Sequence, residues 1–233
     1  QDPMTSLNPV LTVGYQITES LRIHTDMAEE ERRARATELL NLVGIPNPEG
    51  RLKSFPHELS GGMRQRVMIA VALAASPDIL IADEPTTALD VTIQAQIIEL
   101  IKDIREQLGT AVVWITHDLG VVAGVADRVI VMYGCQIVEE GPVAELYASP
   151  KHPYTIGLLE SIPRVDQKGS ELVSIPGAPP ALYAEPKSCS FAVRCPYAFD
   201  RCHQENPPLI TVSGERFVAC WYDIDEEGPR RVF

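Results

Sequence analysis

Residues 79–90 read ILIADEPTTALD, and this stretch decides the fold class of the chain. Its first four residues are apolar, which is typical of a short, buried central strand. Asp83 and Glu84 follow at once, and Pro85 then ends the strand and fixes the next turn. Adjacent carboxylates at the end of a buried strand are costly unless something charged lies beside them. A metal ion or a metal-bound phosphate is therefore expected here, whereas an acidic pair standing alone would indicate a solvated turn.

A second motif lies upstream, where residues 59–67 read LSGGMRQRV. Ser60 is a good N-cap for a helix that begins directly after it. Gly61 and Gly62 let the backbone come close to a ligand, and the free N–H groups of a helix start bind anions. The sequence thus predicts a phosphate-binding turn followed along the chain by a metal-binding strand end.

These two motifs together resemble those of the ATP-binding subunits of ABC transporters. LSGGMRQ is similar to the family's signature motif, ILIADEP to its Walker B strand and TALD to its D-loop. Met63 departs from the glutamine that is commoner at its position. The resemblance implies an α/β fold, namely an ABC-type P-loop NTPase nucleotide-binding domain with a helical subdomain.

A histidine follows a second apolar run. Residues 111–115, AVVWI, predict another buried strand, and His117 comes directly after it in the letters THD. Because ligands in open α/β sheets collect at the carboxyl ends of the strands, we expect His117 at the same end as Asp83 and Glu84. WITHD resembles the family's H-loop, although a lone histidine after a strand is more often structural.

The resemblance implies a role for each residue in ATP hydrolysis, in which water attacks the γ-phosphate in line. Glu84 would be the general base, His117 would steady the γ-phosphate, and Asp83 would hold Mg²⁺. Gln1 begins QDPMTSLNPV, which resembles the family's Q-loop, and would contact Mg²⁺ and the attacking water. The residues expected at the nucleotide of a partner subunit, or at the interface with it, are Ser60, Gly61, Gly62, Gln65 and Asp90.

The sequence contains no G-x-x-x-x-G-K-[ST] phosphate loop (Walker A), which precedes the Q-loop in the family. The chain begins with Gln1 and not with methionine. Since every later motif is intact, we expect an N-terminally truncated, partial nucleotide-binding domain that does not hydrolyse ATP alone.

The composition changes from about Val165, where proline becomes dense and cysteines appear with the spacing C-x5-C-x6-C-x17-C. This spacing is not that of a zinc ribbon, and disulfides are not expected in a protein that uses cytosolic ATP. Four thiolates in such a segment can hold a [4Fe–4S] cluster, with zinc and free structural thiols as alternatives. The proposed ligands are Cys189, Cys195, Cys202 and Cys220.

This Cys- and Pro-rich extension narrows the resemblance. The stretches SCSFAVRCPYAFDRCHQENPPL and HPYTIGLLESIPR resemble the "D"-type ATP-binding subunits of oligopeptide/dipeptide (peptide/nickel) importers, some of which carry an iron–sulfur cluster in this tail. The resemblance implies four segments: a Q-loop, a helical subdomain with the signature motif, an ATPase core with Walker B, D-loop and H-loop, and a Cys-rich extension. Their ranges are 1–10, 11–75, 76–162 and 163–233.

The implied function is to energise uptake of di- and oligopeptides from the cytoplasmic face of the cell membrane. The partners would be transmembrane permease subunits, a second, paralogous ATP-binding subunit and, indirectly, a solute-binding protein. Two alternatives are a soluble ABC ATPase, and a metal-sensing scaffold without ATPase activity in this truncated form. The formal net charge of −12 argues against a nucleic-acid partner, and no apolar run approaches the ~18 residues of a membrane span. The motifs do not distinguish peptides from nickel or other solutes.

Hydrophobic periodicity and capping residues predict the remaining elements. We expect a hairpin over 127–140 with its turn at Gly134 and Cys135, and a loop over 46–58. Helices are expected over 11–25, 28–43, 61–75, 91–108, 142–149 and 153–161.

Overall fold

The computed structural model describes residues 6–87, 89–162, 174–181, 183–184 and 186–230. The chain divides into two compact units, Gln1–His117 and Asp118–Phe233, called unit 1 and unit 2 below. Each unit has its own apolar core.

Three helices of unit 1 pack against one another through apolar faces: α2 (Val13–His24), α3 (Glu29–Leu42) and α5 (Gly61–Leu73). All three were predicted from the sequence to within two residues at each end. The predicted loop over 46–58 is wrong in part, because it contains α4 (Pro48–Arg51) and the 3-10 helix η1 (Pro56–Glu58). Each of these begins at a proline, whose fixed φ suits the first position of a helix.

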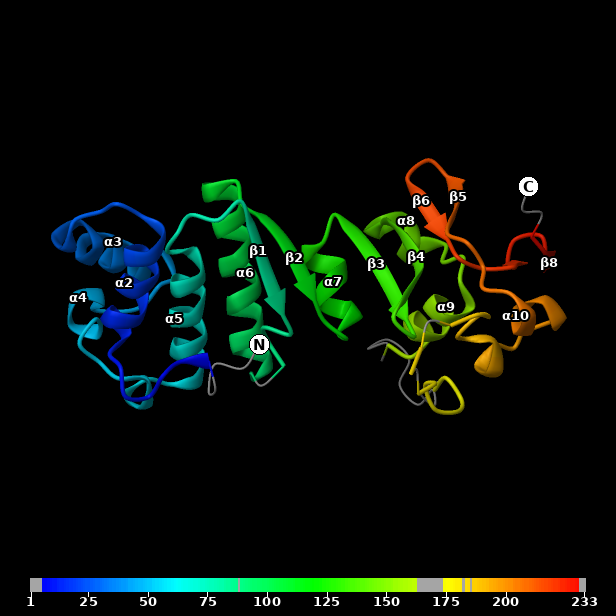
Figure 1. Cartoon of the computed structure of the whole chain (residues 1–233), viewed down its shortest axis with the longest axis horizontal. Coiled ribbons are helices and arrows are strands. Elements are labelled where there is room, and N and C mark those ends of the chain that lie inside the picture. The colour runs from blue at the N-terminus through cyan, green and yellow to red at the C-terminus, as the bar shows by residue number, and fades with distance from the viewer. Residues whose placement is uncertain (1–5, 88, 163–173, 182, 185, 231–233) are drawn as a thin grey trace. The chain divides into compact units, whose positions relative to one another are not determined.

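The other half of unit 1 is a strand–helix–strand unit (Figure 1). Strand β1 (Ile79–Asp83) leads through α6 (Val91–Leu108) to β2 (Ala111–Ile115), and the two strands pair in parallel. A parallel pair needs such a crossover, which α6 supplies. Side chains of α6 share one core cluster with Leu80 on β1 and with Val112 and Trp114 on β2, so the helix covers one face of the pair.

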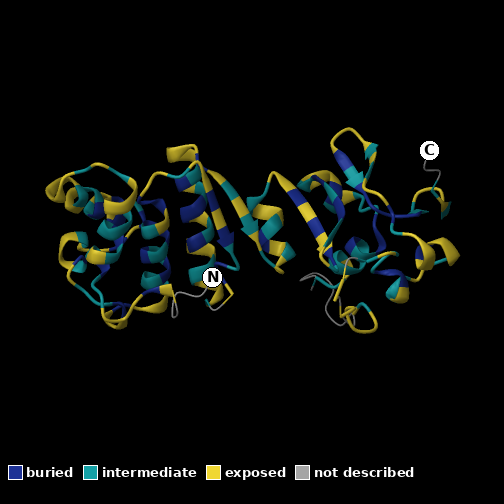
Figure 2. Cartoon of the chain, in the orientation of Figure 1, coloured by how far each residue is buried: buried dark blue, intermediate teal, exposed yellow. Residues whose placement is uncertain are grey.

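The opposite face of this strand pair is exposed, so the prediction of fully buried strands is wrong. Ile79 and Ile81 on β1 are 59% and 67% exposed, and Val113 and Ile115 on β2 are each 49% exposed. Side chains alternate between the two faces of a strand, and the alternation is visible as bands of colour on these strands in Figure 2. Within the described part of unit 1, only the face toward α6 is covered.

Unit 2 contains a four-stranded antiparallel sheet in the order β3-β4-β6-β5. Its first two strands, β3 (Arg128–Tyr133) and β4 (Gln136–Pro142), form the predicted hairpin. Gly134 and Cys135 at the turn have φ values of 54° and 59°. Two left-handed residues are what a two-residue hairpin turn requires, because they match the twist of the strands.

Three helices accompany this hairpin. The predicted helices are present as α8 (Val143–Ala148) and α9 (Pro153–Glu160). The short helix α7 (Leu119–Val125), which Asp118 caps, was not predicted.

The C-terminal part of unit 2 joins the same sheet. After η2 (Ala192–Arg194) and α10 (Asp200–Gln204), strands β5 (Ile210–Ser213) and β6 (Arg216–Val218) form a hairpin, and β6 pairs with β4. A small pair, β7 (Tyr222–Asp223) and β8 (Gly228–Pro229), follows. The extension and the preceding hairpin are therefore one packed body. The four segments expected from the sequence are defined by sequence motifs, whereas the two units are defined by packing. The four segments therefore remain a proposal.

A buried ion pair connects strands β6 and β4. The side chains of Glu139 on β4 and Arg216 on β6 are 1% and 6% exposed, and Glu139 Oε1 lies 3.2 Å from an Arg216 guanidinium nitrogen. The Glu139 carboxylate also accepts hydrogen bonds from the backbone N–H groups of Lys151 (2.7 Å) and His152 (2.9 Å). One carboxylate thus holds together β4, β6 and the chain that enters α9.

Candidate functional site

The candidate site begins where β1 and β2 end. The ladder pairs Asp83 with Ile115, and the Glu84 backbone N–H extends it by donating to the Ile115 carbonyl at 2.9 Å. Glu84 and His117 therefore leave the sheet from neighbouring strands and at the same edge. Parallel pairing is the reason that residues 33 positions apart meet here.

Glu84 and His117 are in direct contact. Oε1 of Glu84 lies 3.1 Å from Nδ1 of His117, and Oε2 accepts a hydrogen bond from the Thr87 hydroxyl at 3.0 Å. The hydrogen bond with His117 and then that with Thr87 lower the pKa of Glu84 below its usual value. The carboxylate is therefore ionised at neutral pH and can accept a proton. The side chains of Glu84 and His117 are 39% and 72% exposed, so a ligand can reach both.

The backbone at Glu84 is unusual, with φ at 45°. A left-handed conformation is uncommon for a residue with a side chain and is often found at functional sites. It turns the chain sharply after β1, and the side chains of Pro85 and Thr86 are buried immediately beyond it. The turn that carries Glu84 is thus anchored on its far side.

The carboxylates here suit a hard cation. Asp83 and Glu84 are adjacent at the strand end, and Mg²⁺ binds through one or two carboxylates together with water and phosphate oxygens. Asp83 is half-buried and lies closest to the sheet. The chemistry of these two carboxylates is compatible with a magnesium ion, and Asp83 as its ligand stays a prediction.

The signature turn forms a second part of unit 1's site. The hydroxyl of Ser60 accepts a hydrogen bond from the Met63 backbone N–H at 3.4 Å, and caps α5 as predicted. Gly61 is exposed, and a Cβ added there would meet no atom within 4 Å. A Cβ added at Gly62 would lie 3.0 Å from a methyl of Ile93, so glycine permits this close packing.

Ile93 connects the signature turn with the D-loop. It lies in the first turn of α6, where its backbone N–H donates to the Asp90 carboxylate at 3.0 Å. Because Gly62 packs on Ile93, the start of α5 lies against the start of α6. Ser60, Gly61, Gly62 and Asp90 are thereby brought into one region.

Two predicted residues are not part of this region as described. Gln65 is 3% exposed inside α5, and its Oε1 has no hydrogen-bond partner within the described residues. A buried amide cannot touch a nucleotide unless the helix moves. Gln1 lies outside the residues that the structure describes, so its role stays a prediction.

Thr87 contacts Glu84 directly, and the sequence analysis did not predict this contact. The only signal available was its position three residues after Glu84 in a turn, a spacing at which a threonine hydroxyl can reach back to a side chain.

The cysteines of unit 2 form a separate group. The four thiols lie close enough for their charges to interact. Cys189 interacts in this way with Cys202, and Cys195 interacts with both. Cys220 interacts with Cys189 and Cys195. The backbones of Cys189 and Cys202 are also joined, by an N–H···O bond of 3.0 Å.

Three of the sulfurs accept a backbone hydrogen bond from the residue two positions further on. The donors are Phe191 for Cys189, Tyr197 for Cys195, and Tyr222 for Cys220, the last at 3.4 Å.

Burial favours the protonated form of the thiols of Cys189, Cys195 and Cys220. It raises the pKa of Cys189, and it raises the pKa of Cys195 to about 11 and that of Cys220 to about 12. In the described residues, no three His, Cys, Asp or Glu side chains are placed to hold a single metal ion. Among the described residues the structure therefore gives no support to a metal site at these cysteines, and the iron–sulfur cluster stays a prediction.

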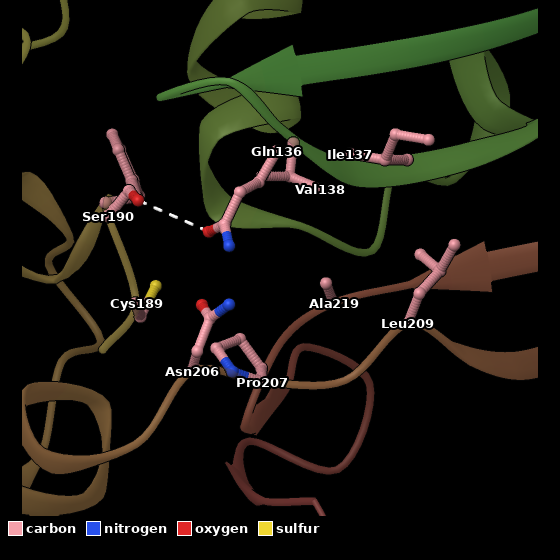
Figure 3. A pocket seen from close by; sticks show the side chains of 10 residues that line it. Gln136, Ile137, Val138, Cys189, Ser190, Asn206, Pro207, Leu209 and Ala219 are labelled. Carbon is pink, nitrogen blue, oxygen red and sulfur yellow. Dashed lines mark hydrogen bonds between the residues drawn. The ribbon is translucent and has the colours of Figure 1, made fainter. Parts of the chain in front are cut away.

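A cavity of about 280 Å³ opens beside Cys189. In Figure 3 the amide groups of Gln136 and Asn206 point toward its centre, and the Ser190 hydroxyl donates to Gln136 Oε1 at 3.3 Å. Pro207 and Leu209 line another side. The cavity gives small molecules a path to this cysteine.

Comparisons with known proteins identify the fold of this chain and its family. The family model "ABC transporter" matches residues 2–87, and the model "Oligopeptide/dipeptide transporter, C-terminal region" matches residues 138–202. A solved structure, the dimeric ATP-binding cassette MJ0796 bound to ADP and phosphate, is 36% identical, with a TM-score of 0.52 over 59% of each chain. The fold is that of the ABC ATPase cassettes.

Three relatives show to which group of ABC transporter ATP-binding proteins this chain is similar. The oligopeptide transport ATP-binding protein OppD of Bacillus subtilis is 58% identical over 95% of this chain and 62% of its own length. AppD of the same organism (55% identical) and the dipeptide transport protein DppD of Escherichia coli (52%) match 99% and 98% of this chain and 70% of their own lengths. The chain belongs to the family of oligopeptide and dipeptide ABC transporter ATP-binding proteins.

Proposed function

We propose that this chain belongs to the ATP-hydrolysing subunit of an importer for di- and oligopeptides. The observation that carries the proposal is the contact between Glu84 and His117, 3.1 Å apart at the ends of two parallel strands. A carboxylate that stays ionised and is open to solvent can take a proton from attacking water. The family of the chain supplies the substrate class.

Each residue at this edge has a distinct task in the proposal. Glu84 orients the attacking water and accepts its proton, and His117 holds Glu84 and steadies the γ-phosphate. Asp83 would hold Mg²⁺, which when bound neutralises phosphate charge. Gln1 is proposed as a further contact to metal and water.

The signature turn would serve a second subunit. Ser60, Gly61 and Gly62 lie at the start of α5, where free backbone N–H groups and the helix dipole favour a phosphate. Gln65 is proposed to support this turn, and Asp90 to lie at the interface between the two ATP-binding subunits.

The partners are proposed from the family. They are transmembrane permease subunits, a second ATP-binding subunit that is a paralogue, and indirectly a solute-binding protein, with this chain on the cytoplasmic face of the membrane. None of the helices in the described residues has the length and apolar character needed to cross a membrane. Attachment to a permease is consistent with that finding.

Peptide uptake tests this proposal. Because the chain spans 62% of the length of OppD, the test uses a chimera in which this chain replaces the matching part of OppD. We expect the chimera to restore uptake of a labelled oligopeptide in Bacillus subtilis cells that lack OppD. A stable chimera that hydrolyses ATP but restores no uptake, and responds to nucleic acid instead, would favour the soluble ATPase.

We also propose that Cys189, Cys195, Cys202 and Cys220 hold a [4Fe–4S] cluster. The four thiols are buried or half-buried, and three of them already accept backbone N–H bonds, which supports the proposal because hydrogen bonds to sulfur tune such clusters. A single tetrahedral ion would need sulfurs about 3.8 Å apart, given a Zn–S bond of about 2.3 Å. A cluster would separate the sulfurs further, because each would bind a different iron.

Anaerobic purification tests the cluster. We expect a brown protein with about four irons per chain, and loss of the colour when any one of the four is changed to serine. Cys135→Ser is the matched control, because Cys135 is exposed in the β3–β4 turn. A colourless, iron-free protein from anaerobic cells would overturn the cluster, and one zinc per chain would favour the single-ion alternative.

A further inference from the structure

Glu84 is held by two side chains, of which one has no assigned role. His117 binds Oε1 at 3.1 Å, and the Thr87 hydroxyl binds Oε2 at 3.0 Å. The two oxygens of the carboxylate are therefore fixed by separate groups. Two such contacts determine the rotation of the carboxylate plane, which one contact alone would leave free.

The backbone explains why the Thr87 hydroxyl is available. Glu84 takes φ 45°, which folds the chain back so that the Thr87 backbone N–H reaches the Glu84 carbonyl at 3.3 Å. Pro85 and Thr86 between them are buried and hold this turn in place. Thr87 itself is exposed, so its side chain is not required for packing.

We propose that Thr87 is a positioning residue for Glu84: with His117 it clamps the carboxylate in one orientation before any substrate arrives. This inference rests on the proposed function, in which Glu84 orients the attacking water. A base that is already oriented needs no reorganisation when water is bound, and misplacement of such groups is costly for catalysis. The strained turn after β1 is then the structural means of bringing Thr87 to Glu84.

The geometry predicts what the loss of this contact would do. Without the Thr87 hydroxyl, Oε2 of Glu84 would lose its 3.0 Å hydrogen bond and only the contact of Oε1 with His117 would remain. The motion of the carboxylate should therefore increase.

The test measures the motion of the Glu84 side chain in this chain, selectively labelled with ¹³C-glutamate and assigned by comparison with Glu84→Gln. We expect Thr87→Val to lower the side-chain order parameter of Glu84 by more than the error of the fit. Thr87→Ser keeps the hydroxyl and should match the parent. Thr92→Val is the control, because Thr92 is an exposed threonine in the first turn of α6.

Two results would overturn the proposal. One is a Thr87→Val chain with the parent's amide spectrum whose Glu84 side chain has the parent's order parameter. The other is a Thr87→Ser chain whose Glu84 order parameter falls below the parent's, and this result can be read even if the valine variant does not fold. The order parameter does not depend on ATP turnover, so an inactive chimera together with a lowered order parameter in Thr87→Val would refute the proposed function and leave the clamp standing.

Discussion

At the scale of single residues, burial sets the charge of His152. Its side chain is 1% exposed, and Nδ1 accepts a hydrogen bond from the Tyr154 backbone N–H at 3.0 Å, which caps α9. Burial lowers the pKa of His152 from 6.5 to about 3. The folded state therefore keeps this ring neutral at a pH where the unfolded state would protonate it.

The lowered pKa of His152 determines how the free energy of unfolding depends on pH. The stabilising contribution is complete above pH 6.5 and is lost as the pH falls toward about 3, at up to ~1.4 kcal/mol per pH unit. His152→Asn still offers a cap but does not titrate. We expect it to lose less stability than the parent between about pH 7 and about pH 5, measured by urea unfolding. The exposed His203→Asn should follow the parent, and equal losses in parent and His152→Asn would contradict the assignment.

At the scale of elements, the cap of α6 supports the strand–helix–strand unit. The Asp90 carboxylate accepts from the Ile93 backbone N–H at 3.0 Å, which satisfies one of the free donors of the helix. We expect Asp90→Ala to lower the free energy of unfolding of unit 1 by about 1 kcal/mol, and Asp90→Asn to lower it much less. Denaturant unfolding of both variants measures this, and indistinguishable losses would show that the cap is not the cause.

In unit 2, the buried ion pair between Glu139 and Arg216 stabilises the packing of elements, as the Asp90 cap does in unit 1. Replacing Glu139 by glutamine leaves the Arg216 guanidinium buried without a counter-charge, which costs about 3–5 kcal/mol. We expect Glu139→Gln to destabilise unit 2 by this order. The matched control is Glu205→Gln, which breaks the exposed pair with Arg201 and should cost less than about 1 kcal/mol. Equal costs in urea unfolding would mean that burial does not govern the pair.

At the scale of the whole molecule, local patterns predicted unit 1 well. The apolar runs of β1 and β2 and the long periodic pattern of α6 are each contained in one stretch of sequence. Parallel pairing then brings Glu84 and His117 together, since both follow a strand. The exposure of Ile81 was not predictable in this way, because an apolar run carries no information on what covers each face.

Unit 2 was less predictable for a physical reason. Strand β6 has three residues, too few to show a period, and its partner on β4 lies far away in the sequence, as in the pair Glu139↔Val218. The burial of Glu139 depends on that pairing, so the sequence gives no sign of it. Thr87 was missed because one hydrogen bond within a strained turn leaves no pattern.

The central claim is that Glu84 carries the chemistry of ATP hydrolysis, and Mg²⁺-dependent turnover by the OppD chimera tests it most directly. Glu84→Gln keeps the shape of the side chain but is a far weaker base. We predict that Glu84→Gln binds ATP as the parent chimera does and has lost turnover, while the exposed Glu106→Gln hydrolyses ATP at the parent rate. Equal hydrolysis by Glu84→Gln and the parent would contradict the claim.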